Sequence, residues 1–168
     1  MPRYSKTLII LHWAMALLIL AAWFTAEGGR QVRLNPPLLH FSLGLSVLLL
    51  VVPRLIARWW GSHPRIEDPQ SPWLNVAAKI GHAVLYGFMI GLPLTGWYAA
   101  SRLGVPVSFF GLPVPAIAAS VQGAPGPIAE LHEVGGTVIL VLAGLHAVIA
   151  LWHQFVLRDG TMARMNPV

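Results

Sequence analysis

Four long apolar segments, separated by connections richer in polar residues, proline and glycine, set the pattern of the chain. They lie near residues 7–26, 38–59, 75–99 and 130–157. Each can cross the roughly 30 Å hydrocarbon core of a bilayer, because a helix needs about 20 residues to span it. The pattern predicts an all-α membrane protein, a four-transmembrane-helix bundle in which residues 1–168 form a single membrane domain.

The first apolar segment could be mistaken for a signal peptide, since Arg3 and Lys6 precede it and Thr25-Ala26 follows it. Its apolar run of about 20 residues is longer than the hydrophobic region of a signal peptide, and it contains His12 and Trp13. We expect this segment to be retained as a transmembrane helix.

Lysine and arginine are unequally divided between the two sides of the predicted bundle. Only Arg30, Arg33 and Arg102 lie on one side. The others, near the termini and the second connection, are Arg3, Lys6, Arg54, Arg58, Arg65, Lys79, Arg158 and Arg164. Because cytoplasmic connections carry the excess of positive charge, both termini are predicted to be cytoplasmic. In a bacterium this topology makes the chain a multi-pass inner-membrane protein with a periplasmic loop at 101–129.

The composition narrows the chemistry. Hydrophobic residues make up 56% of the chain and charged residues 10%, a balance far from that of a soluble globular protein. The net charge of +5 does not indicate nucleic-acid binding, because the basic residues are thinly spread rather than gathered on one face. The absence of cysteine excludes disulfides, iron–sulfur clusters and covalently attached c-type haem. Histidine is then the obvious candidate metal ligand.

Six of the seven histidines fall within or at the ends of the apolar segments, and His63 is expected to be a solvated residue of a cytoplasmic loop. An ionisable residue at membrane depth is costly and usually functional. Any one of the six alone could instead be a hydrogen-bonding partner between helices. Their arrangement along the chain favours a metal site.

Two of these histidines, His132 and His146, lie 14 residues apart on one predicted helix. At 100° and 1.5 Å per residue, they share a face to within about 40° and are separated by about 21 Å along the axis. In the predicted topology His40 has the depth of His132, and His12 has the depth of His146. Each depth therefore offers two imidazoles from different helices, as a six-coordinate haem iron requires. We predict that these four histidines are the axial iron ligands of two haems b.

A zinc or iron site without haem is disfavoured, because intramembrane carboxylates are absent and the two depths cannot share one ion. Arg54 follows His40 by 14 residues and faces the same way, at the depth of the inner haem. A haem propionate would satisfy this cation, and the alternative is an ordinary cytoplasmic anchor. Glycines close to the histidines could leave room for a porphyrin or let helices pack closely; they are Gly44, Gly135, Gly136 and Gly144.

The remaining membrane histidines, His82 and His153, are predicted near the cytoplasmic boundary, with Lys79 close to His82. They are candidates for a quinone site, because imidazole titrates near neutral pH and can both hydrogen-bond a carbonyl and deliver protons. An interfacial histidine that caps a helix end is at least an equal alternative for each. Both are also rivals for the inner haem, where we favour His146 because it is deeper and follows Gly144.

Short motifs follow one another in order along nearly the whole chain. They are Tyr4-Ser5, Leu11-His12-Trp13, His40 with Gly44, Arg54-Leu55 with Arg58, Gly81-His82, Leu85-Tyr86, Pro93 with Gly96, Leu131-His132-Glu133, Gly144-Leu145-His146-Ala147, Asp159-Gly160 and Arg164-Met165. Each is weak alone, but the ordered set resembles the bacterial cytochrome b561 family. The resemblance implies a four-helix, di-haem inner-membrane protein in which histidines matching His12, His40, His132 and His146 hold the haems. Loop 101–129 contains no recognised motif of the family.

The resemblance also implies a function. The best-understood members act as superoxide:ubiquinone oxidoreductases, and others relay electrons between partner proteins and quinone. We therefore expect single electrons to pass from a periplasmic donor, superoxide in the first place, through the outer and inner haems to ubiquinone. Arg30, Arg33 and Arg102 could steer a small anion to the outer side, or they could be ordinary loop residues.

Two other functions stay open. One is a non-enzymatic cytochrome b subunit that anchors a dehydrogenase or hydrogenase partner and relays its electrons to quinone. The other is a haem-free transporter or channel that uses the histidines as a proton path. The expected partners are the lipid bilayer, quinone, and either superoxide or a periplasmic redox protein. A homo-oligomer is an open alternative, no nucleic acid is expected, and the catalytic residues are unknown.

Overall fold

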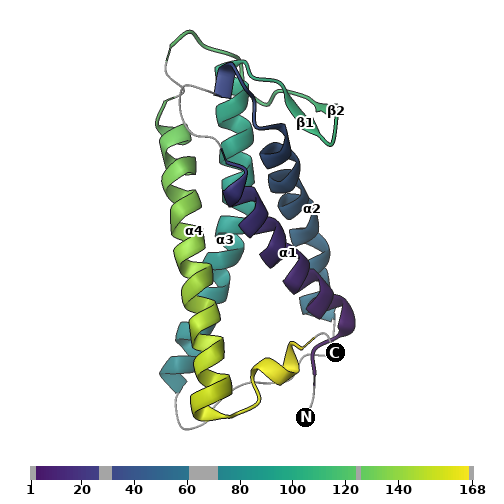
Figure 1. The fold of residues 1–168 in the computed structure, drawn as a ribbon, viewed down its shortest axis with the longest axis vertical. Helices are drawn as coiled ribbons and strands as arrows, with labels where there is room; N and C mark the ends of the chain where they lie inside the picture. The colour runs from purple at the N-terminus through teal and green to yellow at the C-terminus, as the bar shows by residue number, and fades with distance from the viewer. Residues whose placement is uncertain (1–2, 27–31, 61–71, 124–125, 167–168) are drawn as a thin grey trace.

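The computed structural model describes residues 3–26, 32–60, 72–123 and 126–166. Four long helices stand side by side in it: α1 (Lys6–Phe24), α2 (Leu38–Trp60), α3 (Pro72–Leu103) and α4 (Pro127–Trp152) (Figure 1). After α4 come a π-helical turn, η2 (His153–Leu157), and a 3-10 turn, η3 (Met162–Arg164). A two-stranded antiparallel hairpin, β1 (Val107–Phe109) and β2 (Leu112–Val114), lies between α3 and α4.

All four helices are long and apolar enough to cross a membrane, the fourth span running from 127 to 157 through η2. Large apolar side chains such as Leu17, Leu49 and Val141 are exposed on the outside of the bundle. This arrangement suits a protein whose surroundings are hydrocarbon rather than water. The predicted four-helix membrane fold is confirmed, whereas the assignment of the termini to the cytoplasm stays a prediction.

Several helix ends differ from the predicted ones because of local start signals. α3 begins at Pro72 rather than near 75, and α4 begins at Pro127 rather than near 130. Proline is favoured in the first turn of a helix, where its missing N–H has no helical partner to lose. α1 begins after Ser5, whose Oγ accepts a hydrogen bond from the N–H of Leu8.

The hairpin between α3 and α4 is an element that the apolar pattern did not predict. Phe110 and Gly111 form its two-residue turn, with φ angles of 47° and 88°. Positive φ at both central residues is typical of the turns that match the twist of a hairpin. Only the residues from 104 onward leave the helix, so α3 is four residues longer than predicted at this end.

Side chains from the helices hold the hairpin and the segment after it through main-chain atoms. The buried Ser42 Oγ on α2 accepts a hydrogen bond from the N–H of Phe110, at 2.9 Å. On α3, Ser101 Oγ accepts from the N–H of Ile117, and Trp97 Nε1 donates to the carbonyl of Pro115. The hairpin therefore covers the ends of α2 and α3, and we call this the hairpin end of the bundle (Figure 1).

The opposite end of the bundle carries the residues next to both termini, and we call it the terminal end (Figure 1). There the indole N–H of Trp13 donates to the carbonyl of Met165, at 2.9 Å, and the N–H of Tyr4 donates to the carbonyl of Arg164. Between the two ends lies a buried apolar cluster, formed by Met15, Val47, Val51, Met89 and Ile139.

Candidate functional site

Four histidines lie in two facing pairs. The ring centroids of His40 and His132 are 5.9 Å apart, and those of His12 and His146 are 6.1 Å apart. An iron ion with a nitrogen at about 2 Å on each side holds two imidazole centroids about 6 Å apart. The structure thus brings together the two pairs that depth alone suggests, each at the spacing that one ion between the rings needs.

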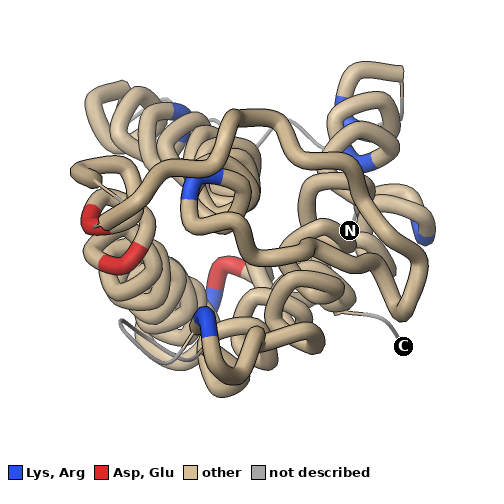
Figure 2. Tube along the Cα trace, turned by 90° about the horizontal axis from the view of Figure 1, so that it is seen from above, with Lys and Arg blue, Asp and Glu red and all other residues tan. Residues whose placement is uncertain are grey.

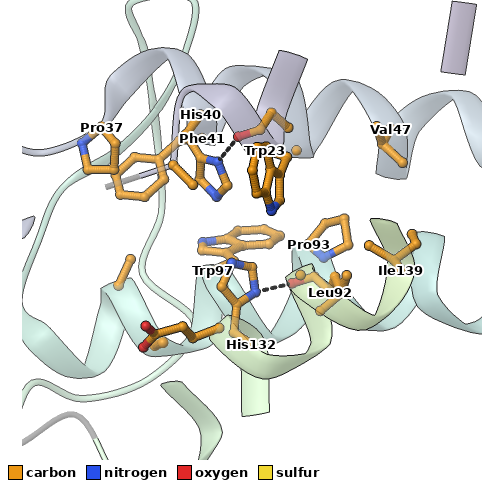
Figure 3. Close-up of a pocket in the computed structure, with 18 of the residues that line it drawn as sticks. Trp23, Pro37, His40, Phe41, Val47, Leu92, Pro93, Trp97, His132 and Ile139 are labelled. Atoms are coloured by element: carbon orange, nitrogen blue, oxygen red, sulfur yellow. Dashed lines mark hydrogen bonds between the residues drawn. The ribbon is translucent and has the colours of Figure 1, made fainter. Parts of the chain in front are cut away.

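The pair at the hairpin end presents two nitrogens ready to bind a metal. His40 Nδ1 is 2.8 Å from the carbonyl oxygen of Ala22, and His132 Nδ1 is 2.9 Å from that of Leu92 (Figure 3). Because a carbonyl only accepts, each Nδ1 carries the hydrogen and each Nε2 keeps its lone pair. A histidine that binds a metal through one ring nitrogen is usually oriented by a hydrogen bond from the other ring nitrogen, as here.

The end of helix α1 makes the carbonyl of Ala22 available to His40. Ala22 belongs to the last turn of α1, where the carbonyls have lost their partners further along the helix. Its oxygen is therefore free to accept from His40, although it also accepts from Thr25 Oγ at 3.2 Å. The end of α1 and the start of α2 are tied together by this bond.

A cavity of about 560 Å³ surrounds the His40–His132 pair, and Figure 3 shows both rings pointing into it from opposite sides. Its volume falls in the range of cofactor sites, roughly 300–1,000 Å³. Gly44 and Gly136 line it, and an added Cβ at either would meet nothing within 4 Å. A flat group between the histidines therefore has room on the sides where these glycines lie.

Three glycines of α3 and α4 have three different uses. A Cβ on Gly135 would lie 2.6 Å from Leu92 Cδ2, so Gly135 serves close packing between the helices, whereas Gly136 faces the cavity. Gly96 has a third use, since a Cβ there would lie 2.6 Å from Cε1 of the His132 ring. This role of Gly96 was not predicted, although its spacing of 14 residues from His82 places both on one face of α3.

The pair at the terminal end differs in its hydrogen bonding. Arg54 is a buried residue, 8% exposed, and its Nη2 lies 2.8 Å from His12 Nδ1. A guanidinium only donates, so here His12 Nδ1 accepts and the ring hydrogen sits on Nε2. For Nε2 of His12 to bind a metal, Arg54 must release this ring.

Arg54 is a buried cation held by neutral partners. Its Nε donates to the hydroxyl of Tyr86 at 3.1 Å, and within the described residues no carboxylate forms an ion pair with it. A buried charge is costly unless it is paired. The donor set therefore fits a cofactor that brings its own carboxylates, as haem does, and it supports the predicted role of Arg54.

The three predicted quinone residues do not form one cluster. His82 lies with the inner pair, its ring centroid 5.4 Å from that of His146, and its Nδ1 donates to the carbonyl of Ala78. It stays a rival for inner-haem ligation. Lys79 is exposed on α3. His153 instead lies in η2, beside Asp159.

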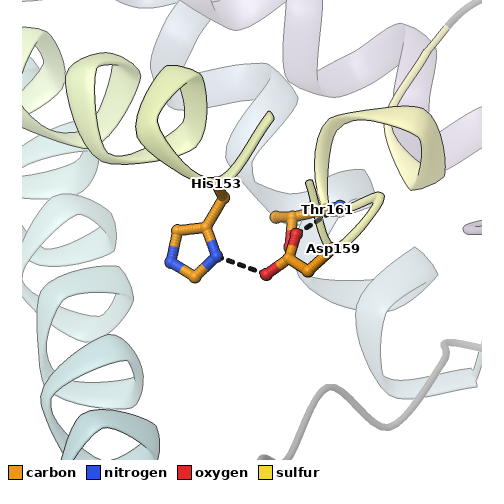
Figure 4. A network of polar contacts seen from close by, with 3 residues as sticks. All are labelled: His153, Asp159 and Thr161. Carbon is orange, nitrogen blue, oxygen red and sulfur yellow. Dashed lines mark hydrogen bonds and ion pairs between the residues drawn. The ribbon is translucent and has the colours of Figure 1, made fainter. Parts of the chain in front are cut away.

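His153 and Asp159 form a close pair at the terminal end. His153 Nδ1 lies 2.5 Å from Asp159 Oδ2, and Asp159 Oδ1 accepts from the N–H of Thr161 (Figure 4). Partial burial raises the pKa of Asp159, but hydrogen bonds from Thr161 and His153 outweigh it and lower the pKa to about 2. Asp159 was not predicted as a partner of His153, because residues six apart do not share a face of an α-helix.

Charged residues are few and scattered when the molecule is seen from above (Figure 2). Glu130 and Glu133 of α4 are the charged residues that line the cavity within the described chain, so the expectation that the membrane segments hold no carboxylates is wrong at the hairpin end. Arg33 is exposed and donates to the carbonyl of Gly123, Arg102 is half-buried near the end of α3, and Arg30 lies outside the described residues. Steering of an anion by these arginines stays a prediction.

Comparison with known proteins assigns the chain to a family. The family described as "Prokaryotic cytochrome b561" matches residues 3–167. The chain is 31% identical to the "Probable superoxide oxidase CybB" of Yersinia pestis, over 98% of this chain and 96% of that one. It is also 31% identical to "Cytochrome b561 homolog 1" of Escherichia coli, over 99% and 98%, and to "Cytochrome b562" of Cereibacter sphaeroides, over 98% and 95%. The chain therefore belongs to the prokaryotic cytochrome b561 family, whose members are haem b electron-transfer proteins of the bacterial inner membrane.

Proposed function

We propose that this protein holds two haems b and passes single electrons from a donor at the hairpin end to ubiquinone at the terminal end. The observation that carries the proposal is the pair of facing histidines at each of two depths, with ring centroids 5.9 Å and 6.1 Å apart. Haem, when bound, supplies the redox chemistry, and the protein supplies ligands, position and electrostatics.

At the hairpin end His40 and His132 would hold the outer haem. Their Nδ1–H bonds to Ala22 and Leu92 orient the rings, and Gly44 and Gly136 leave space beside them. Most of the cavity lining is apolar, which excludes water from the site.

At the terminal end His12 and His146 would hold the inner haem. Arg54 would then exchange its bond with His12 for one with a haem propionate, since a carboxylate is the better partner for a buried guanidinium. This exchange leaves the hydrogen of His12 free to move to Nδ1 and its Nε2 free to bind iron.

The donor that we favour is superoxide, with ubiquinone as the acceptor. Similarity over nearly the full length to a relative named a probable superoxide oxidase supports this choice. In the balanced reaction, two superoxide anions, one ubiquinone and two protons give two molecules of oxygen and one ubiquinol. Arg33 and Arg102 at the hairpin end, with Arg30, are the groups that would attract the anion.

A second candidate function is a relay without enzymatic activity, which takes electrons from a dehydrogenase or hydrogenase partner. One observation favours it: Glu130 and Glu133 line the outer cavity. Carboxylates repel a small anion, whereas they complement the basic surface of a protein donor.

The proposal is tested in purified, haem-replete protein. We expect two haems per chain, both low-spin in the reduced-minus-oxidised spectrum, and rapid haem reduction by superoxide in stopped-flow measurements. One haem or none per chain would contradict the proposal, and two haems without a superoxide reaction would leave the relay.

A charge variant decides how the donor arrives. The triple variant replaces Arg30, Arg33 and Arg102 by Gln. It should lower the rate of superoxide-driven haem reduction about tenfold at low salt and flatten the salt dependence of that rate. Haem content and quinone reduction with an artificial donor should stay unchanged. An unaltered salt dependence in this variant would mean that these arginines do not guide the donor.

A further inference from the structure

The end of α4 does not simply unwind into the C-terminal segment. It widens into the π-helical turn η2, whose last residue is followed by Arg158 in the left-handed region, with φ 52° and ψ 35°. The N–H of Arg158 and that of Asp159 both point back to the carbonyl of His153. Residues other than glycine rarely adopt this backbone conformation. The π-helical turn and Arg158 together reverse the direction of the chain at this point.

The consequence of this return is the contact between Asp159 and the His153 ring. The 2.5 Å hydrogen bond fixes the hydrogen of a neutral ring on Nδ1, because the ionised carboxylate can only accept. The carboxylate is itself held by the N–H of Thr161, so its position is set from two sides. Figure 4 shows the other ring nitrogen, Nε2, on the side of the ring away from Asp159.

The His153 ring is partly accessible and stands apart from the other histidines of this end, whose rings lie against one another within the bundle. The His153 side chain is 35% exposed. Next to it Trp152 and Phe155 are exposed apolar residues, so the ring stands where the hydrocarbon of the membrane borders the terminal end. His82, by contrast, lies against His146 and bonds within its own helix.

We infer that Asp159 is a positioning residue that makes His153 the proton donor to the quinone. The inference rests on the proposed function, which brings quinone to this end of the bundle. A quinone oxygen that has received an electron takes the proton from Nε2 of the His153 imidazolium, so an O–H bond forms as the N–H bond breaks. The ring, held by Asp159, regains a proton from water at the membrane surface. Two such transfers, with two electrons from the proposed donor, give the quinol.

The geometry gives Asp159 two effects on this step. Its carboxylate accepts the hydrogen of Nδ1, so the ring keeps that hydrogen while the proton leaves from Nε2. Its hydrogen bond also fixes the direction in which Nε2 points, which matters because proton transfer needs donor and acceptor within hydrogen-bonding distance. The same arrangement of carboxylate, imidazole and reacting oxygen recurs in enzymes on unrelated folds.

The test compares the full-length, haem-loaded protein with Asp159→Asn and Asp159→Glu variants in detergent micelles. The haems are reduced chemically, ubiquinone is added, and quinol formation is followed over a range of quinone concentrations. We expect Asp159→Asn to lower kcat about 10- to 100-fold with KM changed less than twofold, because general acid catalysis is worth roughly 10²–10⁴. Asp159→Glu should recover much of the rate.

A readout independent of activity follows the His153 ring directly. In protein labelled with ¹⁵N-histidine, assigned with the help of His153→Gln, neutral His153 should carry its hydrogen on Nδ1. Asp159→Asn should lower that population. The matched control is Arg158→Lys. It keeps a positively charged side chain other than glycine at the left-handed position but removes the bond from Arg158 Nε to the Phe155 carbonyl. It should leave both the rate and the ring unchanged.

The outcomes separate the inference from the proposed function. If the unmodified protein binds haem but reduces no quinone, the proposed function fails and the inference fails with it. If the unmodified protein reduces quinone and Asp159→Asn has the same kcat and the same ring hydrogen, only the inference is overturned. Should Asp159→Asn lose its haems, His153→Gln carries the test, with an expected loss of at least tenfold in kcat. An unchanged kcat in that variant overturns the inference.

Discussion

The contact between Gly96 and His132 allows a sharp test of the outer site. In Gly96→Ala the new Cβ would lie 2.6 Å from Cε1 and 3.0 Å from Nδ1 of the His132 ring. Carbon atoms in ordinary contact stay about 3.5–4.0 Å apart, so the ring has to move by about 1 Å. That movement would break the 2.9 Å bond from Nδ1 to the carbonyl of Leu92, since N–H···O bonds rarely exceed about 3.2 Å.

The expected magnitude follows from the loss of this bond. Removing a partner that orients a metal-ligating histidine typically lowers metal affinity about 10- to 100-fold. Overpacking adds a destabilisation of about 1–3 kcal/mol. We therefore expect Gly96→Ala to be folded but to lose the outer haem preferentially, which would leave about one haem per chain.

The assay is haem content by pyridine haemochrome, together with a redox titration that resolves the two haems. Gly91→Ala is the matched control, because it makes the same change on α3 at a position where a Cβ would meet nothing within 4 Å. It should retain both haems. If Gly96→Ala binds two haems as tightly as the control does, the outer haem is not held by a His132 ring in this position.

Further predictions concern the two histidine sites and the terminal end. Gly44→Ala should not lower the stability of the haem-free protein but should lower outer haem binding, because its Cβ enters space that only the cofactor would fill; equal haem binding in calorimetric or spectral titration would contradict this. His40→Ala and His146→Ala should each remove a different spectral component, and loss of the same component would disprove the pairing. Arg54→Met should speed loss of the inner haem to an acceptor protein about tenfold, because the buried propionate partner is gone. Asp159 has a folded-state pKa of about 2 against an ordinary 3.8, so its contribution to the terminal turn is present above about pH 4 and lost as pH falls through 2; a ¹³C carboxyl titration with a midpoint near 4 would refute this.

The sequence predicted those parts of the structure that follow from helical geometry. Four apolar segments of sufficient length give four helices, and a spacing of 14 residues puts His132 and His146 on one face at two depths. Topology then gives each a partner on another helix. The pairing needed no knowledge of side-chain contacts, because a transmembrane helix fixes depth residue by residue.

The features that the sequence did not predict depend on contacts between elements. Gly135 packs against Leu92 whereas Gly136 faces the cavity, because one residue rotates the helix by 100°. The pattern does not show which of these two directions points to the neighbouring helix. The return that joins Asp159 to His153 requires a π-turn and a left-handed residue, and neither has a helical period. The hairpin was missed because its strands are only three residues long.

The way in which the hairpin is attached bears on how this family can diversify. Ser42, Ser101 and Trp97 bind it through the N–H of Phe110, the N–H of Ile117 and the carbonyl of Pro115, which are main-chain groups. Mutations in the hairpin that keep its main chain in place can therefore change the outer surface without disturbing the bundle or the histidines beneath it. If electrons enter at this end, as we propose, selection can alter the surface that meets the donor in small steps while the histidine pairs within the bundle stay unchanged.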